Sequence, residues 1–239
     1  MRRKGGLGFV PLDECRTAES EFLASLHFGD KTVYDVGGFE GVLTLFFARS
    51  AAVVITYEPN PLNYRRCVDN VELNCLTNVR VLNHGLSDQT GSLELVFDPL
   101  MPGAASGNQE IADQIRTHIA TAQKIDVPMV TLDADLVDLK LPAPDLIKID
   151  IEGMELPALR GMARTLKTHH PDLFIELHGA VFEDKIRNAT ELMEYLDSIG
   201  YRAFDIENRK YLPSPVRLSY APSHLYCTKG RSRVGPEVL

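Results

Sequence analysis

The segment from Thr32 to Gly41 constrains the fold of this chain more than any other. It reads Thr-Val-Tyr-Asp-Val-Gly-Gly-Phe-Glu-Gly, and the apolar residues 42–48 that follow can continue as a helix. Glycines allow positive φ and the close approach of a ligand, and the first N–H groups of a helix lack partners within the helix. A strand, a tight loop and a helix in this order can therefore bind a phosphate or a carboxylate.

The spacing of the glycines argues against an ordinary dinucleotide site. The fingerprint Gly-x-Gly-x-x-Gly needs its first glycine where Val36 stands. A second apolar run, residues 52–57, ends at Glu58, and an acid about 20 residues after the first strand can bind both ribose hydroxyls. Asp35 and Glu58 without a pyrophosphate loop suit a nucleoside with a cationic or zwitterionic tail. S-adenosylmethionine is such a molecule.

Strand and helix patterns alternate from residue 31 to residue 199. This alternation predicts an α/β fold with a doubly wound, mostly parallel sheet. We expect seven strands, at residues 31–36, 52–57, 79–82, 146–151, 172–179, 201–206 and 224–228, and helices that include residues 156–166 and 188–199. The last two form a closing pair that places one antiparallel strand in the sheet. The expected fold is Rossmann-like.

Two segments lie outside this alternation. Residues 1–30 are predicted to form an N-terminal arm and a helix, with the helix at about residues 13–28. Residues 31–239 then form a single domain, which contains strand-like runs at 92–97 and 126–132. Between these runs, residues 98–123 break the pattern with prolines and glycines, and we interpret them as an inserted cover over the site.

Composition limits the classes of function. The 239 residues carry a net charge of −8, which disfavours general nucleic-acid binding through bulk electrostatics. Four cysteines, Cys15, Cys67, Cys75 and Cys227, are scattered without a Cys-x-x-Cys pair, so neither a zinc site nor a disulfide framework is predicted. Free thiols favour the cytoplasm. No stretch approaches the length of a membrane span, and the oligomeric state stays open, with a homodimer as one candidate.

The candidate site follows from the strand ends, because ligands bind to doubly wound sheets at the carboxyl ends of the strands. Polar side chains stand at these ends: Asp35, Glu58, Ser87, Asp88, Asp150, Glu152, Glu176 and His178. We expect adenine beside residues 83–88, where the third strand ends.

Five motifs occur in one order along the chain. They are Asp35-Val36-Gly37-Gly38 with Gly41, Tyr57-Glu58-Pro59-Asn60-Pro61, Leu86-Ser87-Asp88, Val130-Thr131-Leu132-Asp133, and the run 146–155, Leu-Ile-Lys-Ile-Asp-Ile-Glu-Gly-Met-Glu. In this order they resemble the FkbM-type class I S-adenosylmethionine-dependent methyltransferases over residues 31–180. The family's loop usually reads Asp-Val-Gly-Ala-Asn-x-Gly, and Gly38 and Phe39 replace its Ala and Asn here.

The resemblance implies methyl transfer, commonly to a hydroxyl of a sugar, lipid-linked or natural-product acceptor. Residue by residue, it implies that the cofactor is held by Asp35, Gly37, Gly41 and Glu58. The full candidate cofactor site also includes Gly38, Pro59, Ser87 and Asp88.

Methyl transfer to a hydroxyl requires removal of a proton, and the candidates for this role are Asp150, Glu152, Glu176 and His178. Histidine has an ordinary pKa near 6.5, which suits a general base. The same four side chains could instead bind a divalent cation that lowers the pKa of the acceptor. Asp150 and Glu152 share one face only if the strand persists through Ile151.

Three other functions stay open at this point. An NAD(P)-dependent oxidoreductase could use a similar sheet, although Val36 interrupts its glycine fingerprint. A non-catalytic S-adenosylmethionine-binding module is compatible with the altered Gly38-Phe39 pair. Methylation of nucleic acid is the weakest alternative, because the chain is acidic.

Overall fold

The structure is a computed structural model that describes residues 17–213 and 218–229. The predicted arm at residues 1–12 and the first residues of the predicted N-terminal helix lie outside these ranges. Within them, the N-terminal helix is α1 (Ala18–Ser25), which begins at a capping box between Thr17 and Ser20.

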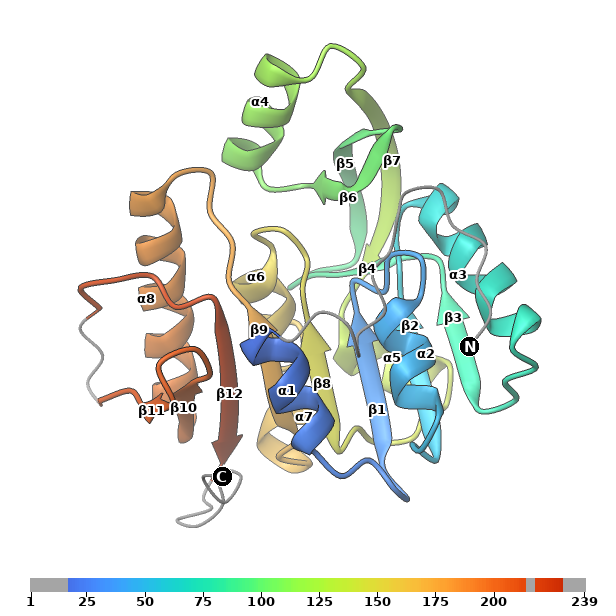
Figure 1. Ribbon diagram of the computed structural model, residues 1–239, viewed down its shortest axis with the longest axis vertical. Coiled ribbons are helices and arrows are strands. Elements are labelled where there is room, and N and C mark those ends of the chain that lie inside the picture. The colour runs from blue at the N-terminus through green and yellow to red at the C-terminus, as the bar shows by residue number, and fades with distance from the viewer. Residues whose placement is uncertain (1–16, 214–217, 230–239) are drawn as a thin grey trace.

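An eight-stranded sheet forms the centre of the molecule (Figure 1), in the order β11-β10-β12-β9-β8-β1-β2-β3. Five neighbouring strands are parallel: β1 (Thr32–Val36), β2 (Val53–Tyr57), β3 (Val79–Leu82), β8 (Leu146–Ile149) and β9 (Asp172–Glu176). The strand β12 (His224–Lys229) runs antiparallel between β9 and β10 (Tyr201–Asp205). All seven predicted strands are confirmed, and the two-residue β11 (Lys210–Tyr211) adds an eighth at the edge.

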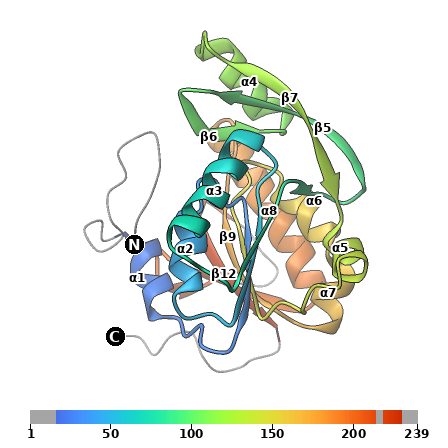
Figure 2. The same cartoon turned by 90° about the vertical axis from the view of Figure 1, so that its right-hand side faces the viewer.

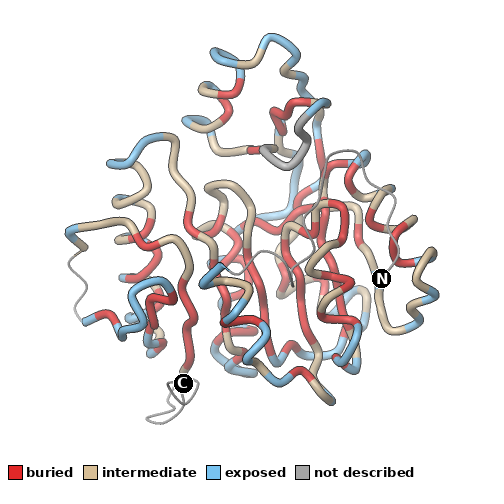
Figure 3. Tube along the Cα trace, viewed as in Figure 1, coloured by how far each residue is buried: buried red, intermediate tan, exposed pale blue. Residues whose placement is uncertain are grey.

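Helices cover both faces of this sheet (Figure 2). One face carries α1, α2 (Val42–Ala48) and α3 (Pro61–Leu73). The other face carries α5 (Leu132–Asp138), α6 (Glu155–Arg160), α7 (Ala163–Thr168) and α8 (Phe182–Ser198). Successive strand residues point to opposite faces, so Val33 packs in the core under α1 and α2 while Tyr34 packs in the core under the other layer. The parallel strands β1, β2, β8 and β9 are consequently buried on both faces, whereas the edge strand β3 is only partly buried (Figure 3).

A second sheet lies beyond the carboxyl ends of the parallel strands (Figure 1). Its four strands have the order β4-β7-β5-β6, with bounds β4 (Gly85–Leu86), β5 (Gly91–Asp98), β6 (Met101–Ser106) and β7 (Gln123–Val130). The segment expected to be a cover, residues 98–123, therefore contains a strand, β6, and a helix, α4 (Gln109–His118). The side chain of Asn108 caps α4 by accepting from the N–H groups of Glu110 and Ile111.

Several predicted boundaries differ from the structure, and the strand expected at 172–179 ends at Glu176. The strand expected to reach Ile151 ends at Ile149, and the helix expected at 156–166 is two helices, α6 and α7. The interruption lies at Gly161, where a Cβ would stand 1.8 Å from the carbonyl oxygen of Ser87, so the chain passes too close for any other residue. The helix predicted from Asn188 begins six residues earlier, at Phe182. In the described ranges, no helix combines the length and apolarity needed to cross a bilayer.

Candidate active site

The glycine loop folds back over the end of β2. The N–H groups of Gly37 and Gly38 both donate to the carbonyl oxygen of Tyr57 at 3.0 Å. Gly37 has a φ of +83°, and a Cβ there would lie 1.8 Å from the carbonyl oxygen of Asp150. The loop can therefore approach the end of β8 this closely only because the residue is glycine.

Asp35 lies beneath this loop and does not line the cavity above it. Its side chain is fully buried, and one carboxylate oxygen accepts from the Thr44 hydroxyl at 2.6 Å. The other lies 3.4 Å from Nζ of Lys148, which also donates to the carbonyl oxygen of Gly37 at 3.0 Å. Asp35 therefore fixes the conformation of the loop from below.

Lys148 is a site residue to which the sequence analysis gave no role. Its ammonium group is buried and also lies 3.2 Å from Oδ2 of Asp150. Burial alone would lower the pKa of Lys148, but the charges of Asp150 and Asp35 outweigh it and raise the pKa above its ordinary value. The signal was present, because a lysine between Ile147 and Ile149 in a buried strand needs anionic partners.

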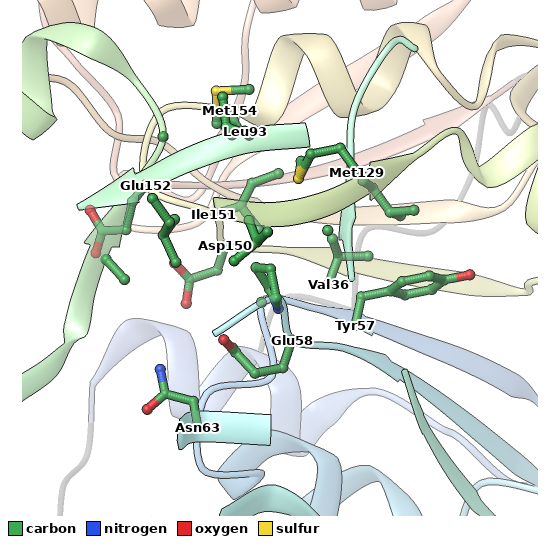
Figure 4. A pocket seen from close by; sticks show the side chains of 18 of the residues that line it. Val36, Tyr57, Glu58, Asn63, Leu93, Met129, Asp150, Ile151, Glu152 and Met154 are labelled. Carbon is green, nitrogen blue, oxygen red and sulfur yellow. The ribbon is translucent and has the colours of Figure 1, made fainter. Parts of the chain in front are cut away.

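A cavity of about 170 Å³, open to solvent on one side, lies between the glycine loop and the second sheet. Glu58 and Asn63 stand on one side of it, and Leu93, Met129 and Met154 on the other (Figure 4). The residues that line it come from both sheets and include Val36, Gly37, Phe39, Pro59, Gly85, Leu86, Leu95, Val127, Asp150, Ile151 and Glu152.

Glu58 faces the cavity from the end of β2 and is almost completely buried. Its two carboxylate oxygens accept from the N–H groups of Phe39 at 2.8 Å and Asn60 at 2.9 Å. Burial raises the pKa of Glu58 to about 7, although these hydrogen bonds and one from Asn63 favour the ionised form. Asn63 also lines the cavity and was not among the predicted residues.

The other predicted cofactor residues are placed less uniformly. Pro59 lines the cavity, whereas Ser87 and Asp88 do not, and at this strand end Gly85 and Leu86 line it instead. Gly38 lies against the Thr56 side chain, and Gly41 is the residue that precedes α2. The structure therefore brings Glu58, Pro59 and Gly37 together at the cavity and leaves Ser87 and Asp88 aside.

Three of the four candidate catalytic residues surround the imidazole of the fourth, His178. Nε2 of His178 lies 3.6 Å from Oδ1 of Asp150, 3.7 Å from Oε2 of Glu152 and 3.6 Å from Oε1 of Glu176. On its other side, Nδ1 lies 2.9 Å from Oε1 of Glu155, a buried carboxylate in the first turn of α6. The four residues proposed from the sequence therefore lie together in the structure. The contact of His178 with Glu155 was not foreseen.

This environment changes the proton affinity of the cluster. Burial lowers the pKa of His178, but the hydrogen bond to Glu155 and the charges of Glu152, Glu155 and Asp150 outweigh it and raise the pKa to about 9. His178 is therefore an imidazolium at neutral pH. Burial raises the pKa of Glu152 to about 7, against the lowering effect of His178.

Glu176 connects this cluster to a second histidine. Its Oε2 lies 3.6 Å from Nε2 of His224, whose other nitrogen contacts Glu207 at 2.5 Å. Burial would raise the pKa of Glu176, but the two histidines and Lys148 outweigh it, and the pKa is lowered. Ligand atoms of Asp150, Glu176 and His178 all lie within 4.8 Å of one another, a spacing that could hold a metal ion.

Known proteins are similar to this chain in sequence and in fold. The family profile described as the methyltransferase FkbM domain matches residues 34–203. "Methyltransferase 1" of Beauveria bassiana is 27% identical over 202 residues, which cover 79% of this chain and 79% of that protein. The "Hexuronic acid methyltransferase AglP" of Haloferax volcanii is 28% identical over 152 residues, which cover 64% of this chain and 58% of that protein.

Among solved structures, the crystal structure of a methyltransferase FkbM from Methylobacillus flagellatus KT superposes with a TM-score of 0.53 at 22% identity. The match covers 84% of this chain and 44% of that chain, so this chain spans less than half of that protein's length. The similarity shows a common fold.

Proposed function

This chain belongs to the FkbM methyltransferase family, and we propose that it transfers the methyl group of S-adenosylmethionine to a hydroxyl group of a small-molecule acceptor. The observation that carries the proposal is the cavity at the ends of β1, β2 and β8, which Glu58 and the glycine loop both face. An α/β sheet binds its ligands at this edge.

The residues around the cavity fit a nucleoside. Glu58 offers a buried carboxylate that would accept hydrogen bonds from the two ribose hydroxyls, with Asn63 beside it. The side chains of Leu86 and Met129 supply the apolar contact that an adenine ring needs. Gly37 lines the cavity without a side chain, which would let the methionine part lie close to the end of β1.

The cofactor, when bound, supplies a methyl group already activated by its sulfonium. The protein must align the acceptor oxygen with that methyl group, exclude water and accept the acceptor's proton. We propose that the cluster of Asp150, Glu152, Glu176 and His178 performs the last task. Its first two members line the cavity, and the other two lie directly behind them.

Isothermal titration calorimetry with S-adenosylmethionine and S-adenosylhomocysteine tests the cofactor assignment. We expect Glu58→Ala to weaken binding about 100-fold, because charge-assisted hydrogen bonds contribute about 1.5–3 kcal/mol each. Glu72→Ala, an exposed acid on α3, is the matched control and should bind as the wild type does. Absence of binding by the wild type at hundreds of micromolar would refute the proposed function.

The acceptor class rests on the family and on its relatives. One relative is named for hexuronic acid, which carries several hydroxyl groups and a carboxylate. We therefore propose a sugar, lipid-linked or natural-product hydroxyl as the acceptor. A panel that begins with glucuronic acid and its glycosides, followed by mass spectrometry, would identify it by a gain of one methyl group.

A divalent cation is a second proposed component of the site. Asp150, Glu176 and His178 supply two carboxylates and an imidazole, a ligand set that first-row divalent metals accept. Against this, Lys148 already places a positive charge 3.2 Å from Asp150. His178 must lose its proton to bind a metal, so we expect binding of Mn²⁺, measured by electron paramagnetic resonance, to strengthen from pH 7 to pH 9 and to be abolished by His178→Ala.

We also keep the predicted domain organisation and location as proposals. The described elements are compatible with one domain from residue 31 onward, with residues 98–123 as its cover. A reducing compartment such as the cytoplasm suits the free thiols of Cys67, Cys75 and Cys227. Limited proteolysis and a fluorescent fusion would test these two proposals.

A further inference from the structure

We infer that Glu152 is the general base of the proposed methyl transfer, and that Ser106, on the cover, is a positioning residue that holds it. The inference rests on the proposed function and selects one residue from the cluster. It also gives the second sheet a role in assembling the catalytic group.

Contacts of the four candidates separate their roles. Asp150 is paired with the buried ammonium of Lys148, which it shares with Asp35, and Glu176 stands between two imidazoles. Neither Glu176 nor His178 lines the cavity, whereas Glu152 does. Within the described residues, the ion-pair contact of the Glu152 carboxylate is with His178 alone, at 3.7 Å.

The backbone of Glu152 is held in an unusual conformation. Its φ is +51°, in the left-handed region that side chains with a Cβ rarely adopt. A hydrogen bond from the cover holds this conformation. The buried Ser106 hydroxyl donates to the carbonyl oxygen of Glu152 at 2.6 Å.

Further contacts fix the turn at Glu152 and Gly153 from both sides. On the cover side, Nδ2 of Asn108 donates to the carbonyl oxygen of Gly153 at 3.3 Å. On the sheet side, the Glu155 carboxylate accepts from the N–H of Gly153 at 2.9 Å and contacts His178. The turn that carries Glu152 is therefore held between the two sheets, and the position of the base depends on docking of the cover.

The electrostatic surroundings agree with this role. Charged groups lie near Glu152 in three directions: Asp150 on its own loop, Glu155 on α6, and Glu176 at the end of β9 with His178 beyond it. The cover contributes the neutral side chains of Ser106 and Asn108. The positive charge of His178 favours the ionised form of Glu152, the form that a base must present to the acceptor.

Methyl transfer moves one proton and one methyl group. The acceptor O–H bond breaks, and its proton passes to the Glu152 carboxylate. The acceptor oxygen forms a bond to the methyl carbon while the carbon–sulfur bond breaks with its electron pair to sulfur, which leaves S-adenosylhomocysteine. The protonated Glu152 beside the His178 imidazolium then returns its proton to water at the open side of the cavity.

The first experiment needs no acceptor. Hydrogen exchange followed by mass spectrometry, in protein saturated with S-adenosylhomocysteine, measures how firmly the turn is held. Ser106→Ala should speed exchange of the backbone amides of residues 152–154 about tenfold, because the hydroxyl no longer holds the carbonyl oxygen of Glu152. Ser92→Ala, an exposed serine on β5 of the same sheet, should leave this exchange unchanged. Equal exchange in Ser106→Ala and the wild type would overturn the positioning role of Ser106.

The second experiment uses the acceptor found with the panel. Glu152→Gln should lower kcat about 10²–10⁴-fold and leave the affinity for S-adenosylhomocysteine within twofold. Ser106→Ala should lower kcat about tenfold with KM for the cofactor unchanged, and Ser106→Thr, which keeps the hydroxyl, should recover part of the loss. Wild-type turnover by Glu152→Gln refutes the base assignment, whereas loss of cofactor binding by the wild type refutes the proposed function itself.

Discussion

Glu58 should make the stability of the free protein and its affinity for the cofactor depend on pH in opposite directions. Burial raises its pKa from 4.5 to about 7, so ionising it in the folded protein costs about 3 kcal/mol, at about 1.4 kcal/mol per pKa unit. This cost is absent below pH 4.5 and complete above pH 7. The contribution of Glu58 to the free energy of unfolding therefore falls as pH rises through this window.

Affinity should follow the opposite course, because the ionised carboxylate is the better acceptor for two ribose hydroxyls. With a pKa of about 7 in the free protein, the Kd for S-adenosylhomocysteine should rise about tenfold from pH 8 to pH 6. Calorimetry measures this Kd, and urea denaturation measures the free energy of unfolding across the same range.

Glu58→Gln isolates the effect, since Glu152 has a raised pKa of its own and contributes with the same sign. The difference in stability between wild type and Glu58→Gln should change by about 3 kcal/mol between pH 4.5 and pH 8. Parallel stability curves for the two proteins, or a wild-type Kd that does not change with pH, would refute the reasoning.

Three further predictions concern the frame of the site. Lys148→Met should destabilise the fold by about 3–5 kcal/mol, because it leaves the fully buried Asp35 without its cation. Urea denaturation measures this loss, and Lys167→Met, which changes an exposed lysine on α7, is the control. Gly37→Ala should prevent folding or lower the free energy of unfolding by more than about 3 kcal/mol, since its Cβ would meet a backbone carbonyl at positive φ. Gly91→Ala, where the Cβ enters open space, should be nearly neutral. Equal melting temperatures of the two variants would contradict this reasoning. His178 has a pKa raised from 6.5 to about 9, so its stabilising contribution is complete below pH 6.5 and is lost as pH rises through about 9. Wild type should thus lose stability relative to His178→Gln over that interval in thermal melts, and a constant difference would argue against the ion pairs.

Local patterns were sufficient to predict the central sheet. Strands such as Val53–Tyr57 and Leu146–Ile149 are short apolar runs bounded by turn residues. Both ends of each strand lie within two residues of the expected positions. The second sheet was harder to foresee. Its strand β6 contains Pro102 and Gly103, which argue against a strand in any local reading, and it exists through pairing with β5.

The positions of the main site residues were predictable from the sequence, but their roles were not. Asp35 and Glu58 stand at neighbouring strand ends as expected, but only the three-dimensional packing reveals that Asp35 supports the loop from below while Glu58 faces the cavity. The roles of Glu155 and Ser106 depend on contacts between elements 23 and 46 residues apart, and no spacing rule reaches that far.

Glu176 gives the molecule a route for electrostatic communication between its interior and its N-terminal helix. One of its oxygens faces His178, and the other faces His224, which Glu19 of α1 approaches to 3.9 Å. A proton gained or lost at His224 therefore alters the charge that His178 experiences, through a single shared carboxylate. A helix that caps the far side of the sheet thus takes part in setting the chemistry at the cavity, even though none of its side chains lines it.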